Sequence, residues 1–263
     1  MDAEQLLIAY DTQLRARMPD RLPAGESLER DGPLLRYSGG PGGGWVLYRD
    51  LAGIEGAALD ELIARQVAFF AGRGDRFEWK HHGHDLPADL CERLGAAGFV
   101  PDDTETIVIA HVADIAGEPQ LPDGVSLREV TERKNFERIA RLEEAVWGEA
   151  NDWLPDMLES ERAVDPDDLS IVVAEAGETV VCAAWIRYAA GTEFGTLWGG
   201  ATLEEWRRRG IYRATVAYRA NLAAERGFRY LETDASDDSN PILQRLGFVA
   251  VTTTTPYIWS PQG

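Results

Sequence analysis

Apolar positions in the second half of the chain switch between a helical and a strand period. Over Lys134–Trp147 they recur every three to four residues, as on one face of a helix, whereas short alternating or continuous apolar runs are typical of strands. The pattern predicts strands at Val125–Val130, Ser170–Ala176, Thr179–Tyr188, Phe194–Thr202, Arg229–Thr233 and Phe248–Trp259, and helices at Lys134–Trp147, Pro155–Val164, Gly210–Arg226 and Pro241–Leu246.

The first half shows the same alternation less regularly. Leu59, Leu62, Ile63, Val67 and Phe70 form one helical stripe that Gly72 and Gly74 end. We expect helices at Asp2–Met18, Ile54–Ala71 and Pro87–Ala97, and strands at Leu34–Tyr37, Trp45–Tyr48, Arg76–Lys80 and Thr104–Val112. Alternating strands and helices favour a mixed α/β sheet.

A short repeat and a linker divide the chain. Leu90–Val100 resembles Leu243–Val249, and each copy joins a short helix that follows a proline to a threonine-rich strand. Residues 114–124, with two prolines and two glycines, are the best linker in the sequence. The repeat therefore predicts two copies of one fold, residues 1–113 and 125–263.

Composition and charge narrow the partners. The chain has 263 residues, 44% of them hydrophobic, and a net charge of −19. Nucleic acid and anionic membranes attract basic surfaces, so neither is expected as a partner. The amino terminus has no signal-peptide pattern, and no apolar run is long enough to span a membrane. With only Cys91 and Cys182, both expected as reduced thiols, we expect a cytoplasmic protein.

The charge is uneven along the chain. Between Glu204 and Arg229 there are seven Arg and three Glu, a local balance of +4. Between Glu143 and Asp168 there are ten carboxylates and one Arg, a local balance of −9. The acidic zone suits a cationic partner, and the basic zone suits an anion.

The basic zone contains the segment Arg207-Arg208-Arg209-Gly210-Ile211-Tyr212-Arg213, between a predicted strand and a predicted helix. The first N–H groups of a helix have no internal partner and lie at the positive end of its dipole. Gly210 allows an anion to approach the backbone, and the arginines add full charges. A pyrophosphate is the expected ligand. The alternative interpretation is that the segment is a solvated basic helix start that binds no ligand.

This segment resembles the acyl-CoA motif of the GNAT superfamily of N-acetyltransferases, Gln/Arg-x-x-Gly-x-Gly/Ala. Arg207, Gly210 and Ile211 match it, and Asn240–Phe248 resembles the superfamily's second motif, a short helix that ends in Gly-Phe. The resemblance covers residues 125–259 and, through the repeat, implies two GNAT-like domains in tandem. Each would be a mixed, mostly antiparallel twisted sheet flanked by helices.

The resemblance also implies a site. Acetyl-CoA would be the co-substrate, with no metal, and its pyrophosphate would lie against the amides of Arg208–Arg213. A backbone N–H of the strand end would polarise the thioester carbonyl while the amine attacks directly. The cofactor-binding residues implied are Gly200, Ala201, Thr202, Arg207, Arg208, Arg209, Gly210, Ile211, Tyr212, Arg213 and Asn240.

Two positions depart from the family pattern. Tyr212 stands where the motif has Gly or Ala, so its ring must point away from the phosphates. Leu243 stands where many members have a Tyr that protonates the leaving thiolate, and leucine cannot donate a proton. Ser239, Tyr212 or water can replace that donor, and Ser239 is our first candidate.

A general base must accept a proton from the incoming ammonium. Glu193, at the start of the strand before the motif, is one candidate. Glu143, Glu144 and Asp152 are others, because acceptors usually bind near the first two helices of this fold. Trp147 and Trp153 lie in the same acidic zone, where they can serve as core anchors or pack on a cationic group.

The first half contains two motifs that could bind ligands. His81-His82-Gly83-His84-Asp85 could hold a metal, but its favoured interpretation is a turn in which Asp85 caps the helix after Pro87. The glycine-rich segment Ser38–Gly44 precedes a strand, so we interpret it as a strand connection. Because Gly53–Ala71 lacks an arginine-glycine motif, we expect no CoA binding in this half.

These observations predict an acetyltransferase that acts on a primary amine of a cationic small molecule, as a monomer or homodimer. The alternatives are a non-catalytic acyl-CoA-binding or sensor protein and a metal-dependent function at His81–Asp85.

Overall fold

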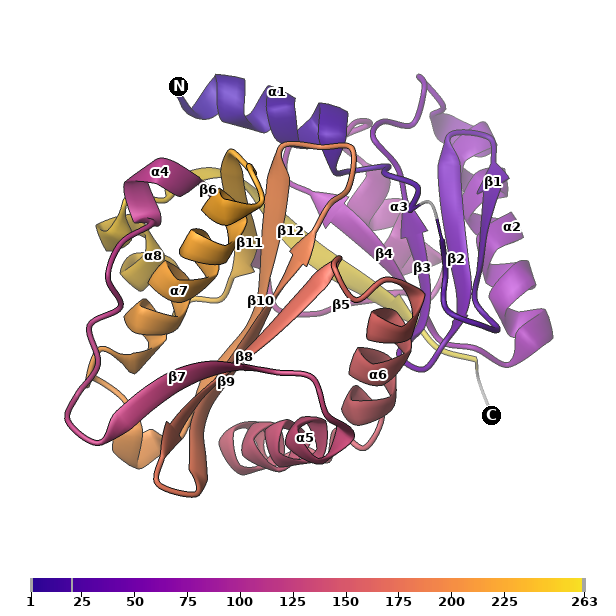
Figure 1. Cartoon of the computed structure of the whole chain (residues 1–263). Coiled ribbons are helices and arrows are strands. Elements are labelled where there is room, and N and C mark those ends of the chain that lie inside the picture. Colours follow the sequence, from indigo (N-terminus) through magenta and orange to yellow (C-terminus); the bar gives the residue numbers. More distant parts are fainter. Residues whose placement is uncertain (1, 20, 262–263) are drawn as a thin grey trace.

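The computed structural model describes residues 2–19 and 21–261. Residues 1 and 20 of the proposed range 1–113, and residues 262 and 263 of the proposed range 125–263, lie outside the described residues. The strands of the described residues form one continuous mixed sheet with helices on both faces (Figure 1). The expected fold class, a mixed and mostly antiparallel sheet flanked by helices, is confirmed.

The elements of the first half end at a short helix before the linker. Leu6 and Tyr10 of the first helix are buried, and Asp2 caps it by accepting a hydrogen bond from the N–H of Gln5 at 3.0 Å. The elements are α1 (Ala3–Gln13), β1 (Ser27–Asp31), β2 (Leu34–Gly40), β3 (Gly43–Leu47), α2 (Gly56–Arg73), β4 (Phe77–His82), α3 (Leu90–Ala96), β5 (Val100–Pro101), β6 (Glu105–His111) and α4 (Val112–Ile115).

The second half follows the predicted order closely, and β10 has the predicted bounds. It contains β7 (Val125–Val130), α5 (Arg133–Trp147), α6 (Leu154–Val164), β8 (Leu169–Ala176), β9 (Thr179–Tyr188), β10 (Phe194–Thr202), the 3-10 turn η1 (Glu204–Trp206), α7 (Ile211–Glu225), β11 (Tyr230–Ala235), α8 (Asn240–Leu246) and β12 (Val249–Trp259).

The two halves repeat one arrangement and exchange their last strands. In each half a helix joins two parallel strands, β3 to β4 through α2 and β10 to β11 through α7. The last strand of the first half, β6, pairs with β11, whereas the last strand of the second half, β12, pairs with β4. Because β6 and β12 also pair with each other, the sheet order is β1-β2-β3-β4-β12-β6-β11-β10-β9-β8-β7.

Helices α7 and α8 pack on one face of the second half's strands, and α5 and α6 pack on the other. The alternation within β8 shows this division, because Val172 contacts the α7 face and Ile171 and Val173 contact the α5 face. Helix α1 crosses the central strands, where Leu6 and Tyr10 pack on Ile107 and Ile109 of β6 (Figure 1). Helix α7 therefore meets β10 from one side while α1, α5 and α6 cover the other.

Several local predictions were wrong in detail. The first helix ends at Gln13 rather than Met18, β1 was not predicted, and the helix expected from Pro87 begins at Leu90. The glycine-rich segment is a β2–β3 hairpin, as interpreted. Residues 116–124 have no helix or strand, but Gly117 exchanges two hydrogen bonds of 2.9 Å with the Asn221 side chain, which fixes the linker on α7.

Candidate acyl-CoA site

The parallel strands β10 and β11 pair only over their first residues. Phe194–Thr196 lies beside Tyr230–Glu232, and beyond this point β10 continues to Thr202 with β9 as its partner. The hydroxyl of Thr233 on β11 donates to the carbonyl of Leu197 at 2.8 Å, where the ladder ends. The backbone groups on this edge of β10 therefore lack a strand partner just before the arginine-glycine segment.

A bulge distorts the same end of β10. Its register with β9 shifts between Gly199 and Ala201, and Gly199 and Gly200 have φ values of 68° and 104°. A Cβ atom on Gly200 would lie 2.6 Å from Cε2 of Tyr212, so only glycine allows this approach. The Tyr212 ring thus packs against the strand and not over the loop amides, which fits the orientation that the sequence required.

The loop between β10 and α7 exposes its arginines. Arg207 donates from Nε to the Thr202 carbonyl at 3.0 Å, and Arg209 lies over the Trp206 ring at 4.7 Å from its centre. Arg208 and Gly210 both have positive φ, 62° and 84°. These contacts leave the charged ends of Arg207, Arg208 and Arg213 exposed around the helix start.

The amino terminus of α7 has open hydrogen-bond donors. Gly210 is its N-cap residue and offers no side chain to the first turn. Within residues 2–19 and 21–261, the N–H groups of Arg208, Arg209 and Gly210 donate no backbone hydrogen bond. Free N–H groups, a helix dipole and exposed arginines are the features that favour binding of an anion such as a pyrophosphate.

The amino terminus of α8 lies near the end of β11. Asn240 donates from Nδ2 to the Thr106 hydroxyl of β6 at 3.1 Å. The Ser239 hydroxyl lies 3.2 Å from that of Ser236 and 3.3 Å from the Ser236 carbonyl. Leu243 is fully buried in the core under α7. Both polar residues of this helix start are therefore engaged within the protein.

Glu143 is the buried carboxylate of the proposed acceptor side. It is 7% exposed, and its Oε2 accepts a hydrogen bond of 2.7 Å from the indole of Trp147. Its Oε1 is buried and has no partner among the described residues. Burial raises the pKa of Glu143, although the Trp147 hydrogen bond opposes this. Glu143 also lies close enough to Cys182 to influence the pKa of that thiol, and Cys182 accepts a hydrogen bond from Thr202.

The other candidate bases are placed differently. Glu193 precedes β10, roughly 20 Å along the strand from Gly200. It binds Gln13 and Arg229, and the hydrogen bond from Gln13 lowers its pKa. Glu144 and Asp152 are exposed. Glu143 is therefore the only one of the four that combines burial, an unpaired oxygen and a raised pKa within the described residues.

The sequence analysis missed a group of ionisable residues on the face of α1. Glu232 and Asp234 alternate along β11, and Lys80 of β4 forms an ion pair with Asp234. Burial and the neighbouring Asp234 raise the pKa of Glu232. Burial and Asp234 also raise the pKa of Glu105 on β6 to about 6. Acidic residues at every second position of an otherwise buried strand were the available signal.

The structure assigns the His81–Asp85 segment a structural role. Asp85 accepts hydrogen bonds from Arg15 at 2.6 Å, Tyr48 at 2.6 Å and the N–H of His82 at 2.8 Å, so the expectation that it caps α3 is wrong. His82 is buried against the Tyr10 hydroxyl, and burial lowers its pKa to about 2. Within the described residues, no three His, Cys, Asp or Glu side chains form a group that could hold a metal.

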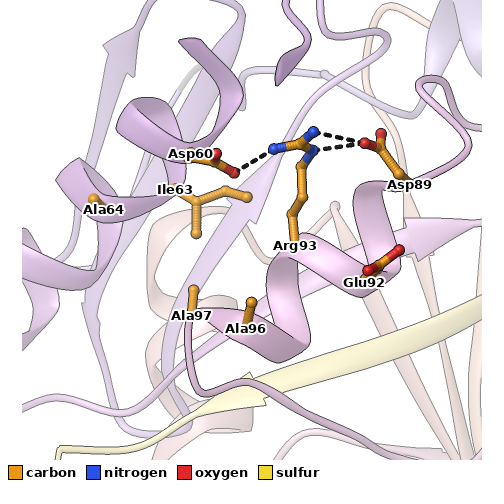
Figure 2. A pocket seen from close by; sticks show the side chains of 8 residues that line it. All are labelled: Asp60, Ile63, Ala64, Asp89, Glu92, Arg93, Ala96 and Ala97. Atoms are coloured by element: carbon orange, nitrogen blue, oxygen red, sulfur yellow. Dashed lines mark hydrogen bonds and ion pairs between the residues drawn. The ribbon is translucent and has the colours of Figure 1, made fainter. Parts of the chain in front are cut away.

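A groove of about 470 Å³ lies apart from these residues, between α2 and α3. Arg93 spans it, bound to Asp60 at 2.7 Å and to Asp89 at 2.7 Å (Figure 2). Residues of the first half alone line the groove, and we assign it no role.

The fold and the loop together define the class. The GNAT fold has two parallel strands that separate, followed by a phosphate-binding loop and a long helix. The strands β10 and β11, the arginine-glycine loop and α7 have this arrangement. Residues 133–248 match the model of the Acetyltransferase (GNAT) family, so the second half of the chain contains a GNAT domain. The family uses acetyl-CoA for acetyl transfer. No curated protein sequence matches the chain, and no helix of the described residues is long and apolar enough to cross a membrane.

Solved structures resemble the whole chain. A GCN5-related N-acetyltransferase from Kribbella flavida shares 17% identity at a TM-score of 0.70, over 99% of this chain and 96% of that one. A GCN5-related N-acetyltransferase from Sphaerobacter thermophilus shares 16% at 0.63, over 98% and 91%. A tandem GNAT protein from the clavulanic acid biosynthesis pathway shares 14% at 0.60, over 99% and 94%. These likenesses show the fold of both halves together.

Proposed function

We propose that the chain transfers an acetyl group from acetyl-CoA to a primary amine of a cationic small molecule. The observation that carries this proposal is the uncapped, arginine-rich start of α7 at the point where β10 has left β11. The proposed cofactor contacts are the loop and helix start Arg207–Arg213, the strand end Gly200–Thr202 and Asn240 of α8.

The pyrophosphate would accept hydrogen bonds from the free N–H groups of the loop, and the arginines would neutralise its charge. The pantetheine would follow the unpaired edge of β10. A backbone N–H at the bulge would then stabilise the oxygen of the tetrahedral intermediate. The Gly199–Gly200 bulge supports this arrangement, because it turns backbone groups of β10 out of the β9 ladder.

Glu143 is the base that we propose for the acceptor amine. A free amine must attack the thioester, so an ammonium substrate first has to lose a proton. The buried, unpaired Oε1 of Glu143 can accept that proton, directly or through a water molecule. The neighbouring Trp147 is 61% exposed and can pack on the acceptor. Glu193 is less suitable because it is paired and lies at the far end of β10.

The cationic character of the acceptor is supported by charge. Residues 143–168, from the last turn of α5 through α6 to the residue before β8, contain ten carboxylates and one Arg, and Glu232 and Asp234 lie on the same face of the sheet. An ammonium or polyamine would be attracted to this face, and an acidic acceptor would be repelled.

The first half is proposed not to bind CoA. In the position that corresponds to the β10–β11 split, Tyr48 after β3 and Asp85 after β4 are joined by a hydrogen bond of 2.6 Å, and Arg15 binds Asp85. This buried network fills the space between the strand ends. The first half instead supplies β6, which lies beside β11.

Two measurements test the proposal: acetyl-CoA binding by isothermal titration calorimetry, and CoA release in the presence of a panel of amines. We expect acetyl-CoA to bind once per chain, and CoA to be released only when a suitable amine is present. Binding without turnover on any amine would favour the alternative, an acyl-CoA-binding or sensor protein. Failure to bind acetyl-CoA would reject both functions.

A further inference from the structure

Arg219 is a buried arginine that has no carboxylate partner among the described residues. It is 1% exposed and lies on α7 beneath β9 and β10. Its Nη1 donates to the carbonyls of Trp185 at 3.0 Å and Trp198 at 3.1 Å, and its Nε donates to the Thr215 carbonyl at 3.1 Å. Arg219 thereby places a positive charge under β10, immediately before the Gly199–Gly200 bulge.

Tyr212 lies seven residues before Arg219, on the same side of α7. Its ring packs against Gly200, so residues 198–200 of β10 lie over Tyr212 and Arg219 together. This stretch begins two residues after the last β10–β11 pair, Thr196 and Glu232. The phenol is therefore near the part of β10 that has lost its strand partner.

The transfer reaction requires a proton at the leaving group. When the amine nitrogen bonds to the acetyl carbon and the C–S bond breaks, the electron pair of that bond goes to sulfur. An alkyl thiolate leaves more readily if a donor protonates it as the bond breaks. The side chain that performs this step must lie beside β10 and hold a proton near neutral pH.

The other side chains near this point are poorly suited. Leu243 has no proton to give and is enclosed by the core. The Cys182 thiol is buried and accepts a hydrogen bond from Thr202, and burial raises its pKa to about 11. The Ser239 hydroxyl is engaged with Ser236. Tyr212 has a phenol with no hydrogen bond to a described residue, on the helix that also forms the proposed pyrophosphate site.

We propose that Tyr212 donates the proton to the departing CoA thiolate; this inference rests on the proposed acetyl transfer. The O–H bond of the phenol breaks as the C–S bond breaks, which gives CoA-SH and a phenolate beside Arg219. The acylated nitrogen gives up its extra proton to solvent, and solvent returns a proton to Tyr212 after the products leave. Tyr212, which stands where the family motif has Gly or Ala, would then have a chemical role in the reaction.

The electrostatic surroundings agree with this role. Burial raises the pKa of Tyr212, so the phenol keeps its proton throughout the neutral range. The nearby charge of Arg219 acts in the opposite direction and stabilises the phenolate that the transfer produces. Arg219 itself remains without a neutralising carboxylate among residues 2–19 and 21–261.

The test compares Tyr212→Phe with the control Tyr218→Phe, which removes a phenol from the same helix, and with Ser239→Ala, which removes the rival donor. We expect Tyr212→Phe to lower kcat about 100-fold with the Kd for acetyl-CoA unchanged, a larger loss than in Ser239→Ala, and Tyr218→Phe to retain wild-type kcat. A normal kcat in Tyr212→Phe, or a loss confined to Ser239→Ala, would overturn the proposal.

A second measurement separates proton donation from a structural effect. Acetyl thioesters of increasingly acidic thiols need less help from a donor. The ratio of the wild-type to the Tyr212→Phe rate should therefore fall towards one across such a series. A constant ratio would mean that Tyr212 acts on structure alone. If the wild-type protein turns over no amine, the proposed function itself fails and this inference fails with it.

Discussion

Gly210 is the residue on which cofactor binding most depends. Its φ of 84° is costly for any residue with a side chain, and a Cβ atom would lie 3.5 Å from Nη2 of Arg213. Gly210→Glu would also place a carboxylate where the pyrophosphate is expected. We predict that the Kd for acetyl-CoA, measured by calorimetry, rises about 10-fold or more.

Gly227→Glu is the matched control for this change. Gly227 follows the other end of α7 and has a φ of 79°, and a Cβ atom added there would meet nothing within 4 Å. The substitution imposes the same backbone strain without approaching the proposed site. Equal weakening of acetyl-CoA binding in both variants would reject a phosphate site at Gly210.

A substitution of Glu143 should lower activity without lowering thermal stability. Glu143→Gln keeps an acceptor for the Trp147 indole but cannot take a proton, so we expect kcat to fall about 100-fold or more. Because a base must be ionised, the wild-type rate should rise with pH through the raised pKa of Glu143, and the variant should lack this limb. The pH dependence of kcat measures both effects.

The contribution of Glu143 to stability should fall with rising pH, whereas the wild-type rate should rise. A carboxyl whose folded pKa is raised stabilises the fold below its unfolded pKa, and this contribution is lost as pH rises through the folded pKa. Glu143→Gln should therefore melt no lower than wild type at pH 8. The exposed neighbour variant Glu144→Gln should change neither activity nor melting. A Glu143→Gln protein that is fully active would exclude Glu143 as the base.

At the residue scale, sequence analysis could identify residues whose role depends only on residues close to them in the sequence. The Arg207–Arg213 segment was recognisable because a helix start and its charges are local. Glu232 and Lys80 were not recognised, because their meaning depends on β4 and β11 lying near each other. Nothing in the local sequence indicated that Asp85 binds Arg15, 70 positions away.

At the scale of elements, the Lys80–Asp234 ion pair joins β4 and β11, the two strands that flank the exchanged strands β12 and β6. Burial alone would lower the pKa of Lys80, but Asp234 raises it above the usual value. Lys80→Met leaves Asp234, Glu232 and Glu105 without that cation. We predict a loss of about 2 kcal/mol in unfolding free energy, measured by urea denaturation.

The unfolding free energy lost in Lys80→Met should increase with pH. Glu105 titrates with a pKa of about 6, so its repulsion with Asp234 is weak at pH 5 and strong at pH 8. Lys134→Met is the control, since Lys134 and its partner Glu132 are largely exposed. An equal and pH-independent effect of the two substitutions would contradict a structural role for the buried pair.

Hydrophobic periodicity predicted most helices and strands, and it predicted β10 with its observed bounds. It did not predict β1, whose residues Ser27–Asp31 are largely polar and partly exposed. Periodicity also carries no information on pairing order. The placement of β6 beside β11 and of β12 beside β4 depends on contacts between residues more than 100 positions apart.

At the scale of the whole molecule, the exchange of β6 and β12 makes each half depend on the other. If the chain is divided between Gln120 and Leu121, β4 and β11 each lose a neighbouring strand. We predict that fragments 1–120 and 121–263 do not fold separately but form a one-to-one complex when co-expressed. A cooperative thermal transition in either fragment alone would contradict this.

The central claim is that the loop Arg207–Arg213 holds acetyl-CoA for transfer to an amine. The most direct test is CoA-thiol release from acetyl-CoA, measured with a panel of primary amines and polyamines for the wild-type protein and Gly210→Glu. We predict release that depends on a cationic amine and is lost in the variant. Release with no amine dependence, or unchanged release in Gly210→Glu, would contradict the claim.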